Sequence, residues 1–169
     1  RLVFVPKKDL SAKSFRKLCF YGIDTYATVI FNGQKIIEAD NMFRKWEKNV
    51  SDILIDGENE LIIRFRSPIK EVLPILNKRD YTLPADNDKA GGVSPYTRKA
   101  PYHYGWDWGP CLVTSGIWKN IDLIGWDSWF VDELFINQVE VSKNIAKLEL
   151  EAQIISDTKQ GGLITISEE

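Results

Sequence analysis

The chain has 169 residues, of which 44% are apolar, so it can bury the core of a globular protein. A net charge of −2, spread over both signs, gives no basic face for nucleic acid, and no run of about eighteen apolar residues is present to form a membrane helix. We therefore expect neither nucleic acid nor a membrane as a partner.

The first residues, Arg1 to Val5, predict a strand. They include neither an initiator Met nor a signal-peptide pattern, so we expect the given sequence to begin within a strand. Further along, the apolar residues 27–31 lead into Asn32-Gly33, the strongest short signal for a hairpin, and 35–38 predict the returning strand.

The segment from Glu60 to Arg66 predicts a strand with one face toward the core, because its outer face holds Ile62, Arg64 and Arg66. The inward-facing residues of this strand are Leu61, Ile63 and Phe65. The next segment, Ile69 to Lys78, predicts the one longer helix of the chain, and Pro74 limits its length.

Regular patterning stops over residues 80–110, a stretch much longer than ordinary connections and therefore functional or disordered. Its many aromatic residues argue against disorder. Residues 117–124 then predict a return strand. Cys19 lies in an apolar strand, so we favour a buried free thiol there over a disulfide with Cys111.

The character of the sequence changes near Gly125. A linker and a first strand are predicted over 126–140, a cleanly alternating strand over 146–154, and a turn followed by a third strand over 157–166. This is far short of the roughly one hundred residues of an immunoglobulin-like sandwich. We therefore expect one β-sandwich domain over residues 1–125 and an incomplete immunoglobulin-like β-module over 126–169.

Residues that could carry catalysis are not arranged for it. His103 is the only histidine, which excludes a His-rich metal site and leaves any histidine-based triad dependent on one residue. Asp86 to Gly91 is a poor calcium loop because Ala90 stands where an oxygen ligand is needed. We expect no catalytic residue, no metal and no cofactor in this chain.

The most informative segment runs from Tyr102 to Pro110 and places Asp107 between Trp106 and Trp108. The carboxylate can accept two hydrogen bonds from neighbouring hydroxyls, and the indoles offer flat apolar faces to a sugar ring. The alternative is a tight aromatic corner in which Asp107 accepts hydrogen bonds from local backbone N–H groups.

The stretch from Tyr21 to Val29, continued by Asn32-Gly33, resembles the sugar-binding domain of glycoside hydrolase family 2. Three further runs are similar to its β-mannosidase branch in particular. They are Asp40 to Arg44, Arg98 to Ala100 followed by Gly105 to Pro110, and Thr114 to Trp118.

This resemblance implies a jelly-roll or galactose-binding-like β-sandwich, then an immunoglobulin-like domain, then a catalytic (β/α)₈ barrel that removes terminal β-mannose with retention. The catalytic glutamates belong to the barrel, so Asn59-Glu60 is not the family's Asn-Glu acid/base pair. The resemblance also implies that Trp106 and Asp107 contact the terminal β-mannoside, whereas Arg98, His103 and Trp108 support their loop. The missing barrel is then the partner of this chain.

Three hypotheses follow for the function. The chain is an accessory domain that completes a β-mannosidase substrate pocket, a free-standing carbohydrate-binding module, or a structural spacer. A bacterial periplasmic or secreted protein and a lysosomal protein both fit, so the compartment stays open.

Overall fold

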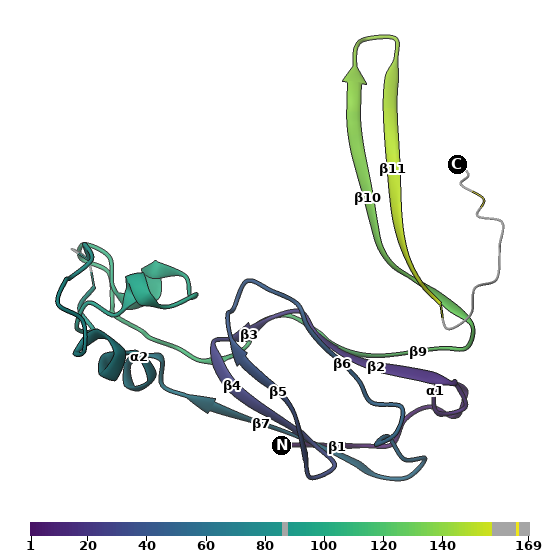
Figure 1. The fold of residues 1–169 in the computed structure, drawn as a ribbon, viewed down its shortest axis with the longest axis horizontal. Coiled ribbons are helices and arrows are strands. Elements are labelled where there is room, and N and C mark those ends of the chain that lie inside the picture. Colours follow the sequence, from purple (N-terminus) through teal and green to yellow (C-terminus); the bar gives the residue numbers. More distant parts are fainter. Residues whose placement is uncertain (86–87, 157–164, 166–169) are drawn as a thin grey trace. The chain divides into compact units, whose positions relative to one another are not determined.

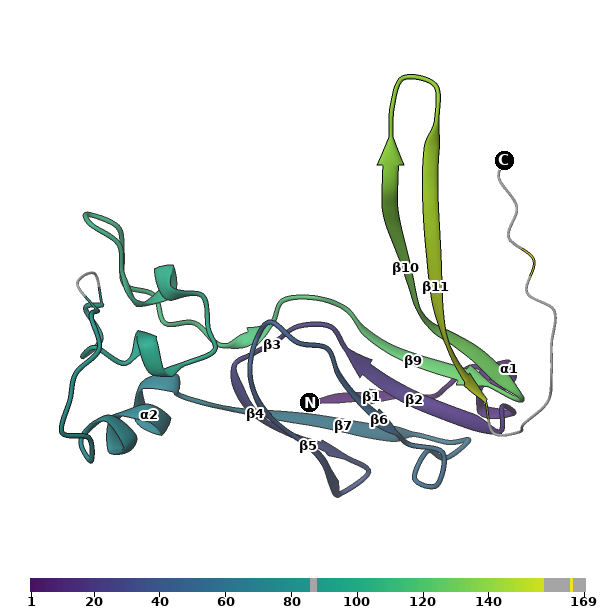
Figure 2. The same ribbon diagram turned by 45° about the horizontal axis from the view of Figure 1, so that its top comes forward.

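A computed structural model describes residues 1–85, 88–156 and 165, and it divides into two compact units (Figures 1 and 2). The first unit runs from Arg1 to Gly125, and the second begins at Trp126. Among the described residues, no helix is long and apolar enough to cross a membrane.

The first unit consists mainly of strands joined by short turns. The strands are β1 (Leu2–Phe4), β2 (Phe15–Phe20), β3 (Ile23–Asp24), β4 (Tyr26–Phe31), β5 (Gln34–Asp40), β6 (Trp46–Asn49), β7 (Asn59–Arg66), β8 (Gly116–Ile117) and β9 (Ile121–Trp126). The helices are α1 (Lys8–Ser11) and α2 (Pro68–Leu76), with two 3₁₀ turns, η1 (Ser94–Tyr96) and η2 (Pro101–Tyr104).

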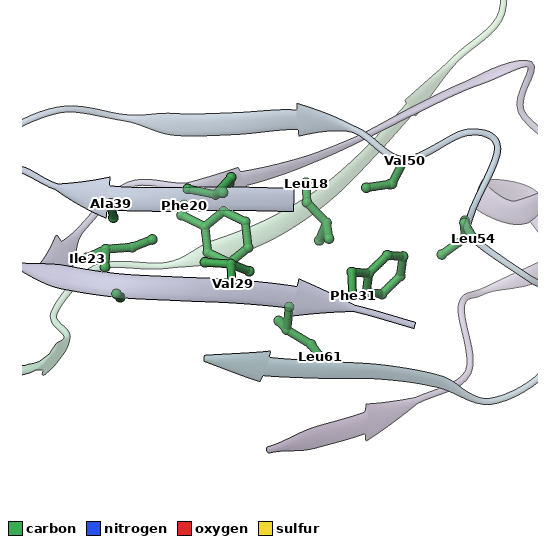
Figure 3. Packing of buried hydrophobic residues seen from close by; sticks show 11 residues of the cluster. Leu18, Phe20, Ile23, Val29, Phe31, Ala39, Val50, Leu54 and Leu61 are labelled. Carbon is green, nitrogen blue, oxygen red and sulfur yellow. The ribbon is translucent and has the colours of Figure 1, made fainter. Parts of the chain in front are cut away.

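Two sheets form a β-sandwich. One sheet has the strand order β1-β7-β4-β5 and the other β6-β2-β9, while β3 and β8 form a separate short pair. Side chains from both sheets meet in the core: Leu18 and Phe20 of β2 pack with Val29 and Phe31 of β4 and with Leu61 of β7 (Figure 3). The expectation of an all-β sandwich is confirmed.

The hairpin predicted at Asn32-Gly33 joins β4 to β5. Asn32 has φ of +46° and Gly33 has φ of +79°, and a two-residue turn that matches the twist of its strands needs positive φ at both positions. Local turn chemistry therefore sets the start of this strand pair.

Strand β7 confirms the prediction for residues 60–66, and its inward-facing residues belong to the core cluster. Helix α2 confirms the longer predicted helix. It begins after Ser67, whose side chain accepts a hydrogen bond from Lys70 N, and it contains Pro74 in its interior. Val72 of α2 packs with Val93 and Tyr104 in a second, smaller core that holds the irregular segment.

The single return strand predicted over 117–124 is wrong, because the segment divides into β8 and β9. Strand β8 pairs with β3, whereas β9 joins the sheet of β2. Between β8 and β9 the backbone bonds to the residue that follows β2, because Asn120 O accepts a hydrogen bond from Tyr21 N. The segment crosses between sheets, and alternation of apolar residues carries no signal for such a crossing.

Cys19 is a buried thiol that forms no disulfide with Cys111, as predicted. In the second unit, β10 (Trp129–Val141) and β11 (Ala146–Ser156) form an antiparallel pair. Leu134, Ile136 and Leu150 share one face of this pair, but all three are exposed. Within the described part, the residues that were predicted to face inward are therefore not covered by a core. The turn and third strand expected over 157–166 fall almost entirely outside the described residues.

Candidate functional site

The Trp106–Gly109 turn follows η2 and Gly105. Gly109 N donates a hydrogen bond of 2.5 Å to Trp106 O, which closes the turn. A Cβ atom at position 109 would lie only 2.9 Å from the same oxygen. The turn therefore requires glycine at this position because the backbone approaches too closely for any side chain.

Asp107 lies at the top of this turn with φ of +34°, in the left-handed region that few non-glycine residues adopt. Its side chain is exposed, and its carboxylate makes no hydrogen bond or ion pair with the residues that the structure describes. Among the described residues, the Asp107 carboxylate thus accepts no hydrogen bond from a backbone N–H group. Both of its oxygens are available to accept hydrogen bonds from a ligand.

The two indoles beside Asp107 are also exposed, Trp106 by 61% and Trp108 by 94%. Large apolar side chains that gather at one exposed place mark a contact site more often than scattered ones do. Trp108 buries too little surface to brace the loop by packing. The turn thus presents a carboxylate between two flat apolar faces.

Lys89 lies outside the Trp106–Gly109 turn and holds it in place, a role that no sequence pattern predicts. Its Nζ donates to the carbonyl oxygens of Asp107 (3.0 Å) and Gly109 (3.2 Å), and its backbone N donates to Tyr104 O. The neighbouring Asp88 carboxylate accepts from Ala90 N at 2.7 Å. Two segments of the irregular region are thereby tied together.

Tyr104 anchors the segment that leads into the turn. Its ring is fully buried in the second core, and its hydroxyl donates to Thr97 Oγ1 at 2.9 Å. Burial raises the pKa of Tyr104 to about 12, so the hydroxyl remains a donor at every physiological pH.

The other residues expected to support the loop lie outside the turn. His103 Nδ1 is 3.0 Å from Thr114 Oγ1, and its ring stacks on Tyr102. Burial, followed by the charge of Lys99, lowers the pKa of His103, which favours the neutral imidazole. The Arg98 guanidinium is 3.9 Å from the Asp40 carboxylate, and Arg98 O accepts from Met42 N, so Arg98 links this region to the end of β5.

A buried ion pair, which the sequence did not reveal either, lies beneath these residues. The ammonium of Lys99 is bonded to the Asp24 carboxylate and donates to Thr114 O at 2.8 Å. The Thr25 hydroxyl donates to the other Asp24 oxygen. The ion pair joins the segment before η2 to β3, and the hydrogen bond to Thr114 O joins it to the segment after the Trp106–Gly109 turn.

We expect Lys89→Met to loosen the Trp106–Gly109 turn and to leave the sandwich intact. The substitution removes both hydrogen bonds from Nζ and keeps the aliphatic stem. Exposure to water limits the cost to about 1 kcal/mol. Amide hydrogen exchange should quicken at residues 106–109, whereas exchange in β4 and β7 should not change. Lys78→Met, at an exposed lysine after α2, is the matched control, and equal exchange in both variants would contradict the role given to Lys89.

A family model described as the glycosyl hydrolase 2 galactose-binding domain-like family matches residues 1–119. The β-mannosidase B of Thermothelomyces thermophilus is 34% identical over 147 residues, which is 84% of this chain and 16% of the relative. The β-mannosidase B of Aspergillus terreus is 33% identical over 98% of this chain and 20% of its own length.

Among solved structures, the β-D-mannosidase of Dictyoglomus thermophilum is similar, with a TM-score of 0.80 and 37% identity. The match covers 92% of this chain and 19% of that protein. The chain thus spans about a fifth or less of the relatives that it matches.

Proposed function

Because this chain belongs to the glycosyl hydrolase 2 galactose-binding domain-like family, in its β-mannosidase branch, we propose that it is a non-catalytic part of a retaining β-mannosidase. That enzyme hydrolyses terminal, non-reducing β-D-mannose residues in a separate catalytic domain. The role of this chain is to complete the substrate pocket.

The observation that carries the proposal is the presentation of Asp107. Its carboxylate is exposed, is unpaired among the described residues, and stands between two exposed indoles on a turn fixed by Lys89. A charged acceptor of this kind binds vicinal hydroxyls strongly, and the indoles suit the C–H face of a pyranose. In this proposal Trp106 and Asp107 contact the terminal mannose, and His103 and Arg98 support the loop.

The Asn59-Glu60 pair has a structural role that accounts for it fully. Asn59 is completely buried, and its side-chain amide donates hydrogen bonds to Ile55 O and Gly57 O across the turn before β7. Glu60 forms an ion pair with Arg1, the exposed residue that precedes β1.

The strand pair β10–β11 belongs, in this proposal, to a second β-domain of the immunoglobulin-like kind that begins at about residue 126. An exposed apolar face on a two-stranded pair supports it, because such a pair is not stable alone and its face needs a covering layer.

We expect this chain by itself to hydrolyse no β-mannoside and to bind mannose no tighter than the millimolar range. One turn with one carboxylate cannot enclose a sugar ring, and tight small-molecule sites bury most of their ligand. Assays with a chromogenic β-mannoside and calorimetry with mannose test both expectations. Turnover by the purified chain would contradict the non-catalytic role, and micromolar binding would favour a free-standing carbohydrate-binding module.

A further inference from the structure

A pocket of about 280 Å³ lies on the first unit, and neither Trp106 nor Asp107 lines it. It opens between β3, β8 and the segment that carries Tyr102 and His103. The volume equals that of about nine water molecules at ~30 Å³ each, which is room enough for one sugar ring.

The charge of the pocket is balanced internally. Asp24 is a buried lining residue, but both carboxylate oxygens are already bonded, one to the Thr25 hydroxyl and the other to the Lys99 ammonium. The ion pair therefore acts as a fixed dipole with no net charge. A charged ligand would enter without a counter-ion, so the pocket favours a neutral one.

Polar groups suited to hydroxyls line one side. His103 and Thr114 are hydrogen-bonded to each other, and Ser115 is exposed beside them. Hydroxyl and imidazole groups can each donate and accept, which matches the donor-and-acceptor character of a sugar hydroxyl.

Three partly exposed aromatic side chains line the opening of the pocket. One face of the Tyr102 ring stacks on His103, and the Lys119 ammonium lies 4.5 Å from the centre of the Trp118 ring, whereas Phe43 makes no ring contact among the described residues. Phe43 and Tyr102 are each 64% exposed, and Trp118 is 48% exposed. Phe43 and Trp118 also line a neighbouring hollow of about 690 Å³, so the pocket is open to solvent on that side. Exposed flat apolar surface around a few convergent polar groups is the usual composition of a small-molecule site.

We propose that this pocket is a second carbohydrate site, which binds one ring of a neutral saccharide. The ring lies against the exposed side chain of Phe43, and its hydroxyls exchange hydrogen bonds with Ser115, Thr114 and His103. The site does not depend on the Trp106–Gly109 turn or on a catalytic domain, so it can be tested on this chain alone.

The test is a titration of the ¹⁵N-labelled chain with methyl β-D-mannopyranoside, methyl β-D-glucopyranoside and methyl β-D-galactopyranoside, followed by NMR. At least one glycoside should bind saturably with a dissociation constant in the millimolar range, about 1 to 10 mM, as an open single-ring site allows. The shifted amides should be those of Ser115, Gly116 and Trp118.

Gly116→Leu is designed to fill the pocket. A Cβ atom at position 116 meets no atom within 4 Å, so the new side chain enters open space without displacing the backbone. Affinity should fall at least about tenfold. Gly57→Leu adds the same side chain outside the pocket, also without a close contact, and should bind as the unmodified chain does. If Gly116→Leu does not fold, Ser115→Leu serves the same purpose.

Three results would overturn the proposal. They are the absence of binding by all three glycosides up to solubility, unchanged affinity in the pocket-filled variant, and shifts confined to residues 106–109. Shifts confined to 106–109 would place the sugar on the turn and leave the function proposed above intact.

Discussion

Replacing Asp107 by alanine is expected to lower kcat/KM of a β-mannosidase that carries this chain by about 30- to 1,000-fold. The carboxylate makes no bond within the described residues, so its two oxygens are free for sugar hydroxyls. Two charge-assisted hydrogen bonds contribute about 1.5–3 kcal/mol each, and water replaces part of that, which leaves a loss of about 2–4 kcal/mol in the transition state.

The matched variant is Asp107→Asn, which keeps the shape and one acceptor oxygen and should fall between the wild type and Asp107→Ala. Both variants should melt within a few degrees of the wild type, because the turn is held by Lys89 through backbone carbonyl groups. A destabilised alanine variant with normal kcat/KM would instead assign Asp107 to bracing the loop. Normal activity and normal stability together would favour a structural spacer.

Lys99→Met is expected to lower the free energy of unfolding by about 3–5 kcal/mol, the usual cost of leaving one member of a buried ion pair without its partner. The Lys99 side chain is entirely buried, and its ammonium serves both Asp24 and Thr114 O. The loss is a large fraction of the total stability of a domain of this size, so the midpoint of urea denaturation should fall clearly.

Two controls isolate the pair. Lys35→Met removes an exposed partner of Glu38, 3.9 Å away, and should change stability by less than about 1 kcal/mol. The double variant Asp24→Asn, Lys99→Met removes both charges while Thr25 keeps an acceptor, and it should regain a substantial part of the loss. A single variant within about 1 kcal/mol of the wild type would show that the pair contributes little to stability.

Local rules were sufficient for much of the fold. The Asn32-Gly33 turn, the alternation in β7 and the segment that forms α2 are encoded by neighbouring residues, because turn torsions and strand or helix periodicity depend on a few positions. The same is true of the Trp-Asp-Trp turn as a candidate, since its residue types lie next to each other in the chain.

The all-β class, the main hairpin and the segment that carries Asp107 could therefore be predicted from local sequence. Three features follow only from long-range contacts: the division of the return strand into β8 and β9, the anchoring of the turn by Lys89, and the Lys99–Asp24 pair. Those contacts join residues 18 and 75 positions apart, and they form only when the two sheets and the irregular segment come together. Neither composition nor periodicity encodes such pairings, because the two partners are distant in the sequence and approach each other only when the whole chain has folded.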